Sequence, residues 1–308
     1  MNYSMKMTTF LIVAAVCGSI YLLAMGLFKE DKPLYLGISL DKAPSVNNLE
    51  FLTESKMPTQ VVLLPSAWQL DDSISSDTLL AISKKGMAPS LIWKPVQELQ
   101  ISFEDIVKGK LDDHLKNAAE QIKKLNVPLV IWFEPYIKAE NGDVRGSSYK
   151  EAYQYIVRYF QKQNVSNVLW GFSISTDRDK QNKISNDYPG NDYIDILGMS
   201  EGLDDSKTSE TSWRGFDTIF ESTYREFKQL APKKPIVVFE NHIVSKFNAE
   251  SKKEWLIQAL ETCKAWEISV YMVKESEGQK ELLMDEKIQK YFTRSPPASQ
   301  WLKKLLGK

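Results

Sequence analysis

The chain has few of the residues on which metal, disulfide and nucleic-acid chemistry depend. It contains two histidines, His114 and His242, and two cysteines, too few for a zinc site of the Cys/His type. Cys17 lies in an apolar run and Cys263 in a predicted helix, so we expect no intrachain disulfide. Lysine and arginine total 39 against 40 aspartate and glutamate. This balance gives no large basic field to hold nucleic-acid phosphates, and we expect neither a nucleic-acid partner nor a metal.

Gly-rich turns and low-complexity linkers are also missing. No Gly-rich turn follows the first predicted strand, so a dinucleotide-binding fingerprint is absent and we expect no cofactor. Charged residues make up 26% of the chain and apolar residues 43%. These values exclude a disordered, collagen-like or multi-span membrane protein. After an N-terminal segment, the sequence predicts one folded domain over residues 33–308.

One long uncharged run is present near the N-terminus, from Met7 to Phe28, with Lys6 before it and charged residues from Lys29 to Lys32 after it. As a helix it would reach about 33 Å, enough to cross a bilayer. The run extends beyond a normal signal-peptide core, and no small-x-small cleavage site precedes Lys29. We therefore predict that residues 1–32 are a transmembrane or signal-anchor segment and that the following domain is extracytoplasmic. The alternative is a cleaved signal peptide and a secreted protein.

Eight short apolar runs recur along the rest of the chain, with longer amphipathic helical patterns between them. The runs are continuous rather than alternating, which is typical of parallel strands buried on both faces. Eight strand–helix units in residues 33–308 predict a (β/α)8 TIM barrel, of the α/β class. The predicted strands are Pro33–Leu40, Thr59–Pro65, Ala88–Trp93, Pro128–Phe133, Asn167–Ser173, Tyr193–Met199, Pro235–Phe239 and Ile268–Val273. The predicted helices include Leu111–Leu125, Tyr149–Gln163, Phe216–Leu230 and Lys252–Trp266.

Two glutamates follow predicted strands directly, Glu134 after the fourth and Glu240 after the seventh. In a TIM barrel the loops after the strands build the active site. A pair of carboxyl groups there suits glycoside hydrolysis, in which one protonates the leaving oxygen and the other attacks the anomeric carbon or activates water. The alternative for each glutamate is a salt bridge at the rim of the barrel.

Aromatic residues gather at the same predicted edge, and sugar rings stack on flat apolar faces. We predict a saccharide cleft whose contacts are Trp68, Trp93, Trp132, Tyr136, Trp170 and, two positions after Glu240, His242. The alternative is that these aromatic rings fill the barrel. We expect His114 to be a solvated helix residue.

Several stretches carry a resemblance to a known family. The sequence Tyr-Pro-Gly-Asn-Asp-Tyr-Ile-Asp-Ile-Leu-Gly at residues 188–198 is similar to a Tyr-Pro-Gly-Asp-x-Tyr-Val-Asp-x-x-Gly motif before the sixth strand of glycoside hydrolase family 26, the β-mannanase family. Residues 111–131, 167–170, 234–240 and 252–255 also resemble that barrel. The resemblance covers roughly residues 88 to 275. It implies that Glu240 is the nucleophile and Glu134 the acid/base, with Glu140 as a rival acid/base.

The sequence departs from the family pattern at three places. Phe133 stands before Glu134, where the family has a sugar-contacting histidine. Ser200 follows the sixth strand in place of an aspartate, and no tyrosine is near it. The eighth strand ends in Val273, Lys274 and Glu275 rather than in an aromatic residue.

Together with the predicted anchor, the resemblance implies a membrane-anchored, retaining endo-glycosidase that hydrolyses a β-linked polysaccharide such as β-mannan, β-glucan or an exopolysaccharide. The alternative is a catalytically inactive barrel of the same kind. Such a barrel would bind glycan, or a partner from the polysaccharide-synthesis machinery, at the membrane surface.

Overall fold

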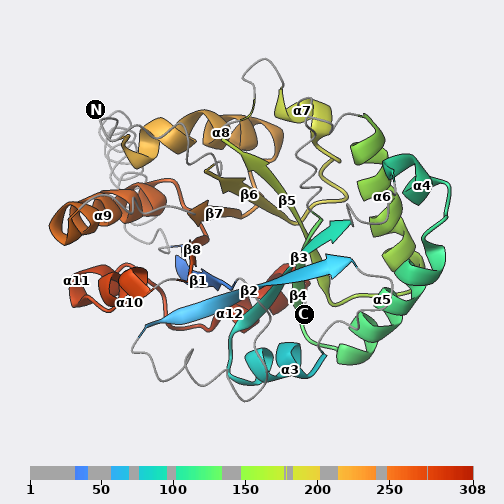
Figure 1. Cartoon of the computed structure of the whole chain (residues 1–308), viewed down its shortest axis with the longest axis horizontal. Coiled ribbons are helices and arrows are strands. Elements are labelled where there is room, and N and C mark those ends of the chain that lie inside the picture. The colour runs from blue at the N-terminus through green and yellow to red at the C-terminus, as the bar shows by residue number, and fades with distance from the viewer. Residues whose placement is uncertain are drawn as a thin grey trace, which may run out of the picture. The chain divides into compact units, whose positions relative to one another are not determined.

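Eight parallel strands close into a barrel in chain order, because β1 pairs with β8 as well as with β2 (Figure 1). The computed structural model describes residues 32–40, 57–68, 76–95, 102–133, 147–176, 178, 183–201, 214–240, 248–275 and 277–307. The barrel unit begins at Pro33. The predicted (β/α)8 barrel is therefore confirmed. Its strands are β1 (Tyr35–Ser39), β2 (Thr59–Trp68), β3 (Ala88–Pro95), β4 (Leu129–Phe133), β5 (Val168–Ser175), β6 (Ile196–Ser200), β7 (Ile236–Glu240) and β8 (Val270–Lys274).

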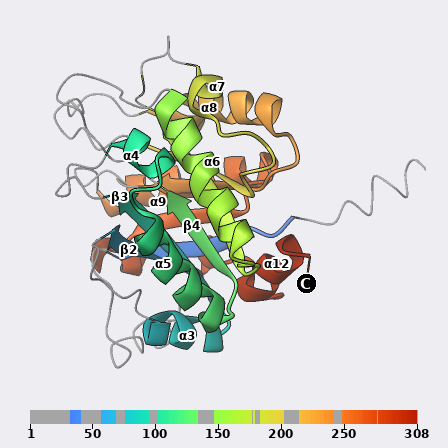
Figure 2. The same ribbon diagram turned by 90° about the vertical axis from the view of Figure 1, so that its right-hand side faces the viewer.

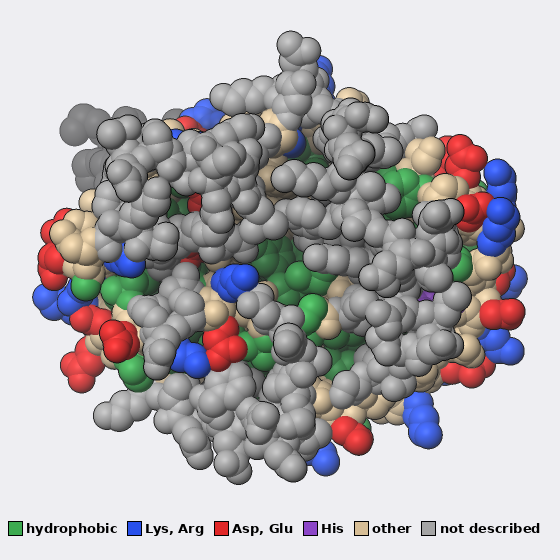
Figure 3. Space-filling model, in the orientation of Figure 1, with side chains coloured by type: hydrophobic (Ala, Val, Ile, Leu, Met, Phe, Trp, Pro, Cys, Tyr) green, Lys and Arg blue, Asp and Glu red, His purple; other side chains and the backbone are tan. Residues whose placement is uncertain are grey.

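Helices surround the barrel (Figure 1), and the four predicted from periodicity are present as α5, α6, α8 and α9. Figure 3 shows the same face, with hydrophobic side chains at its centre and most charged side chains at its edge. The described helices are α3 (Ser76–Lys84), α4 (Phe103–Val107), α5 (Asp112–Leu125), α6 (Ser147–Lys162), α7 (Ile184–Asp187), α8 (Phe216–Leu230), α9 (Ala249–Ala265), α10 (Glu277–Leu283), α11 (Glu286–Gln289) and α12 (Ala298–Leu305).

The strand side chains fall into two apolar layers, because successive residues of a strand point to opposite faces. One layer fills the barrel interior, and in β7 it contains Val237 and Phe239. The other layer packs against the helices, and in β7 it contains Ile236 and Val238. The large ring of Trp132 occupies the interior, where its Nε1 donates to Ser90 Oγ at 2.8 Å.

The C-terminal helix closes the end of the barrel at which the strands begin. Ala298 and Leu302 of α12 belong to the interior layer, and Figure 2 shows α12 beside the start of β1. The Tyr35 hydroxyl donates to the carbonyl oxygen of Pro296 at 3.1 Å, and the Ala298 N–H donates to Gln60 Oε1 at 3.0 Å. The opposite, carboxyl end of the strands is therefore the end that remains for a substrate.

The stretch before β6 that resembles the family motif forms a turn rather than the start of the strand. Gly190 has a φ of +108°, a conformation that favours glycine. Asp195 then fixes the chain to β5, since its Oδ2 accepts from the Trp170 N–H at 2.8 Å and its own N–H donates to the Trp170 carbonyl at 2.8 Å. The predicted strand from Tyr193 consequently begins at Ile196.

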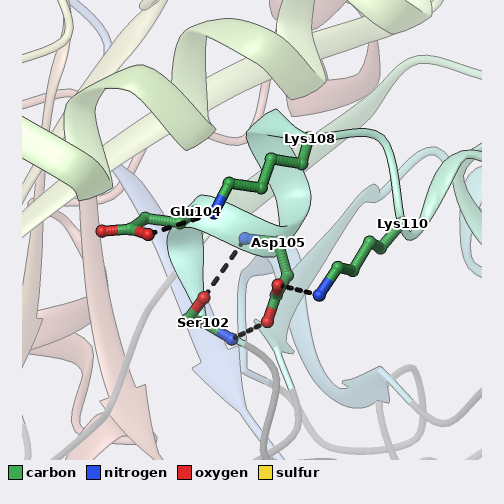
Figure 4. A network of polar contacts seen from close by, with 5 residues as sticks. All are labelled: Ser102, Glu104, Asp105, Lys108 and Lys110. Carbon is green, nitrogen blue, oxygen red and sulfur yellow. Dashed lines mark hydrogen bonds and ion pairs between the residues drawn. The ribbon is translucent and has the colours of Figure 1, made fainter.

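Helix α4 begins with a capping box, in which Ser102 and Asp105 satisfy each other's backbone N–H groups (Figure 4). Asp105 Oδ1 also lies 2.6 Å from Lys110 Nζ. The ion pair with Lys110, followed by the hydrogen bonds with Ser102, lowers the pKa of Asp105 to about 2. Lys108 pairs with Glu104 on the same helix at 3.4 Å.

Within the described parts of the chain, no helix is long and apolar enough to cross a membrane. The predicted anchor segment, Met7–Phe28, lies outside those parts.

His114 is a partly buried residue of α5, and the expectation that it is solvated was wrong. Its ring stacks on Trp93 with the ring centroids 6.2 Å apart. Burial disfavours the charged imidazolium and lowers the pKa of His114 to about 4. The side chain of His114 therefore packs toward the barrel.

Interior packing predicts that Gly171→Ala destabilises the barrel. A Cβ at Gly171 would clash with Cε3 of Trp132, and such overpacking costs about 1–3 kcal/mol. Thermal unfolding should show a Tm several degrees below that of the wild type. In a Trp132→Phe background the same glycine substitution should cost less, and an equal cost in both backgrounds would contradict this account.

The burial of His114 predicts a pH-dependent loss of stability. The unfolded chain takes up this proton near pH 6.5 and the folded chain only near pH 4, so the contribution of neutral His114 is complete above pH 6.5 and falls as the pH falls toward 4. The difference in unfolding free energy between wild type and His114→Leu should change over this window by at most about 1.4 kcal/mol per pH unit. Asn117→Leu, an exposed change in the same helix, should show no such change; a flat difference for both would contradict the prediction.

Candidate functional site

The two strands that precede the predicted catalytic glutamates end on the same side of the barrel, because all eight strands are parallel. Phe133 is the last residue of β4, and Glu240 is the last residue of β7. Glu134 follows Phe133 directly and lies outside the described residues. The barrel therefore brings the ends of β4 and β7 to one face, as the sequence predicted.

The end of β4 is held firmly from the helix side. The Phe133 ring is parallel to that of Tyr149 on α6, with centroids 5.8 Å apart, and makes an edge contact with Phe103 of α4. The Tyr149 hydroxyl donates to the Phe133 carbonyl at 3.1 Å. The residue where the family has a sugar-contacting histidine is thus a core residue, which fixes the backbone from which Glu134 departs.

Glu240 is almost completely buried, with 1% of its surface exposed. It lies two positions after Val238 and therefore on the same side of β7, and the Cα partner of Val238 on β8 is Tyr271. Burial, and next to it the charge of Glu240, raises the pKa of Tyr271 well above its ordinary value. Glu240 and Tyr271 therefore lie on the same, helix-facing side of the sheet.

A second acidic residue, Glu201, follows the neighbouring strand β6. It follows Ser200, the last residue of β6, whose Cα partner on β7 is Phe239. The Arg214 guanidinium lies 3.5 Å from the Glu201 carboxylate, and the Arg214 carbonyl accepts from Trp255 Nε1 at 3.0 Å. The ends of β6 and β7 therefore carry two carboxylates, one of them paired with arginine.

Sequence reasoning did not assign a role to Tyr271, Glu201 or Arg214. A signal existed for Glu201, which follows its strand as the two predicted glutamates follow theirs. The sequence did not distinguish Tyr271, because a tyrosine inside an apolar strand is normally interpreted as a core residue.

Three of the predicted sugar-contacting aromatic residues are core residues. Trp93, Trp132 and Trp170 expose 3%, 2% and 6% of their surfaces. Trp93 and Trp170 pack edge-on against Phe160 of α6, on the helix side of the sheet. Trp132 fills the barrel interior at 4.9 Å from the Phe239 ring. The structure therefore corrects the prediction that these three rings line a saccharide cleft.

The remaining predicted contacts are not placed by the structure. Trp68 is the last residue of β2, but its side chain is outside the description, as are Tyr136, Glu140 and His242. Their roles stay predictions. Among the residues that the structure does describe, no group of three or more His, Cys, Asp or Glu is placed to hold a metal ion.

Two inward positions at the carboxyl ends of the strands are polar. Alternation along β6 and β8 directs Ser200 and Lys274 inward, since Ile196, Val270 and Met272 belong to the interior layer.

Comparison with protein families identifies the kind of barrel. The model of glycosyl hydrolase family 26 matches residues 103–275, more than half of the chain. A comparison with curated proteins gave no match.

Three solved structures share this fold at low sequence identity. GH26C from Muricauda sp. MAR_2010_75 has a TM-score of 0.59 and 14% identity, over 86% of this chain and 89% of that one. The GH26 β-mannanase BoMan26A from Bacteroides ovatus has a TM-score of 0.54 and 15% identity, over 89% and 88%. The cellulose synthase subunit Z from Clostridioides difficile has a TM-score of 0.56 and 13% identity, over 83% and 98%.

Proposed function

Because the chain belongs to glycosyl hydrolase family 26, we propose that it is a membrane-anchored, retaining endo-glycosidase that hydrolyses a β-linked polysaccharide outside the cytoplasm. One observation carries the proposal beyond family membership: Glu240 ends β7 at the face where β4 ends and Glu134 follows. A glycosidase of this kind needs two carboxyl groups, one on each side of the scissile bond.

In the proposed reaction Glu240 attacks the anomeric carbon and Glu134 donates a proton to the leaving oxygen. Water then hydrolyses the glycosyl-enzyme, with Glu134 acting as base. Direct attack requires the two carboxyl groups to stand about 5–5.5 Å apart, whereas inversion through an intervening water requires about 6.5–9.5 Å. Family membership favours the shorter separation.

The substrate class rests on the structural neighbours and on the predicted anchor. One neighbour is described as a β-mannanase and another as a subunit of a cellulose synthase, and both names concern β-linked polysaccharides. An anchor at residues 7–28 would keep this barrel at the membrane, beside the machinery that makes or exports such a polymer. We therefore propose β-mannan, β-glucan or the host's own exopolysaccharide as substrate.

Two conservative variants test the mechanism. Glu240→Gln keeps the size of a buried side chain but removes the nucleophile, and kcat should fall by about 10³-fold or more on every substrate. Glu134→Gln should lose activity on natural glycan but keep part of it on aryl glycosides with activated leaving groups, which need no proton. NMR of the first product should show retained anomeric configuration.

The control for both is Glu221→Gln, which changes an exposed carboxylate of α8 that pairs with Arg225 at 2.6 Å; we expect near wild-type activity. An inert wild type across β-mannans, β-glucans and the exopolysaccharide would contradict the enzyme proposal. Binding of glycan without turnover would then favour the inactive barrel.

The anchor is tested on intact cells. If residues 7–28 stay attached and the barrel is extracytoplasmic, added protease should release the domain while the N-terminal segment stays with the membrane fraction. A blot with tags at the two ends distinguishes the fragments. Recovery of a soluble secreted protein beginning near residue 30 would show that the segment is a cleaved signal peptide.

A further inference from the structure

Positive charge gathers at the end of the barrel where the strands begin. Each of the helices α3, α5, α6, α8 and α9 ends shortly before the next strand, so that its last turn lies at this end. Every one of these last turns contains lysine, and none of their last four residues is aspartate or glutamate. The lysines are Lys84, Lys123, Lys124, Lys162, Lys228 and Lys264. This distribution is uneven, because the whole chain has 39 basic and 40 acidic residues.

The C-terminal helix α12 adds charge to the same end, which it closes. Lys303 and Lys304 lie in its last turn and are exposed. The Ser299 N–H donates to the Gly86 carbonyl at 3.4 Å, so α12 begins beside the turn after α3, where Lys85 is exposed. We refer to the last turns of α3, α5, α6, α8 and α9, together with α12, as the basic end.

Helix dipoles explain only part of this pattern. A lysine in a last turn compensates the partial negative charge of the helix end, but Lys233, after α8, and Arg294 are exposed residues outside the helices. Arg294 belongs to the same end, because the N–H of the preceding Thr293 donates to the Leu34 carbonyl at 2.8 Å, just before β1. In the described connections that lead into the strands, the acidic residues are Asp192, Asp195 and Glu267. The basic end therefore has more positive charge than its helices need.

The chain enters the barrel at the basic end. β1 begins at Tyr35, and the residues just before it include the exposed Lys32. The predicted anchor ends at Phe28, and the five peptide steps from Phe28 to Pro33 extend to at most about 18 Å. An anchor at residues 7–28 would therefore keep the basic end close to the membrane surface. Anionic lipids attract lysine and arginine there, over a Debye length of about 8 Å at physiological ionic strength.

We propose that the basic end is a membrane-contact surface, which rests on the anionic lipid headgroups of the bilayer that holds the anchor. The exposed part of α12 suits such a position, because Leu305, which is 36% exposed, lies beside the two lysines of its last turn. Basic residues next to an exposed apolar side chain are typical of helices at a lipid–water interface. The inference rests on the anchor of the proposed function and not on its catalytic part.

Such a contact would orient the barrel as well as hold it. All eight strands are parallel, so their carboxyl ends lie opposite to the basic end. With the basic end on the bilayer, the ends of β4 and β7 face away from the lipid and toward polymer outside the membrane. The surface thus adds an orientation of the candidate active site to the proposed function.

The contact can be measured on the full chain in nanodiscs of phosphatidylcholine and phosphatidylglycerol whose headgroups carry a nitroxide quencher. A fluorescent label at Lys303→Cys should be quenched, whereas a label at Glu250→Cys, exposed in the first turn of α9, should not. Both variants are made in a Cys17→Ser background, in which the remaining Cys263 is buried. Equal quenching of the two labels, or of neither, would overturn the inference. A Lys303→Cys label that is shielded from a water-soluble quencher but not quenched by lipid would overturn it too, because another macromolecule or a second copy would then cover the basic end.

Charge reversal tests whether the contact is electrostatic. With the label at Lys85→Cys, the pair Lys303→Glu and Lys304→Glu should lower the equilibrium constant for contact by about tenfold or more, since each lysine near an anionic surface adds to the attraction. Added salt, or phosphatidylcholine in place of phosphatidylglycerol, should weaken the contact of the unreversed protein in the same way. The control pair is Lys116→Glu and Lys252→Glu, which makes the same change of net charge near the starts of α5 and α9 and should leave the quenching unchanged. A similar loss for both pairs, or for neither, would overturn the inference.

A cleaved N-terminal segment would remove the anchor but leave the surface testable. The mature protein would then be sedimented with vesicles of either lipid. Salt-sensitive binding to phosphatidylglycerol vesicles that is lost in the pair Lys303→Glu and Lys304→Glu would support the contact surface while the anchor proposal fails. Absence of such binding would overturn the inference. None of these measurements requires hydrolysis, so their outcome does not depend on whether the barrel is an active enzyme.

Discussion

The pairing of β1 with β8 is the constraint on which the rest of the structure depends. Five Cα partners, from Tyr35 with Val270 to Ser39 with Lys274, close the sheet on itself. Closure removes both sheet edges, and because every neighbouring pair of strands is parallel, all eight carboxyl ends meet on one face of the barrel. Without it, residues as distant in sequence as Phe133 and Glu240 would have no reason to end at a common site.

Closure also creates an interior that must be filled, and the filling determines which residues are left for chemistry. Trp132 extends across the barrel to Phe239, and it fits because Gly171 and Gly198 offer no Cβ against its ring. Phe239 points into the interior. Because side chains alternate along a strand, the next residue, Glu240, points toward the layer that contains Tyr271. The surroundings of the proposed nucleophile thus follow from interior packing.

Much of the fold was predictable from the sequence because buried parallel strands are continuous apolar runs. The apolar runs at Val61–Leu64 and Ile236–Phe239 were enough to predict two of the strands. The predicted strand ends lie within a few residues of the observed ends. The face to which each ring points was not predictable: Trp93 and Trp132 both stand near strand ends, yet one faces the helices and the other the interior. That difference depends on strand parity and on closure, which pairs residues far apart in sequence. The pairing of Glu201 with Arg214, which joins the end of β6 to a residue just before α8, was not predictable either.

Burial of Glu240 changes what its neighbours must do. Glu240 is 1% exposed, so its carboxylate has lost most of its hydration. The ionised form is then stable only where hydrogen-bond donors surround it and no uncompensated negative charge lies nearby. Ser200, in place of the family's aspartate, removes one acidic group from the end of β6, and Arg214 compensates the charge of Glu201 beside it. Both features lower the repulsion that Glu240 would meet as an anion. A preorganised, water-poor site of this kind strengthens each remaining interaction with the carboxylate. The departures from the family pattern around β6 are therefore compatible with the proposed role of Glu240 as an ionised nucleophile.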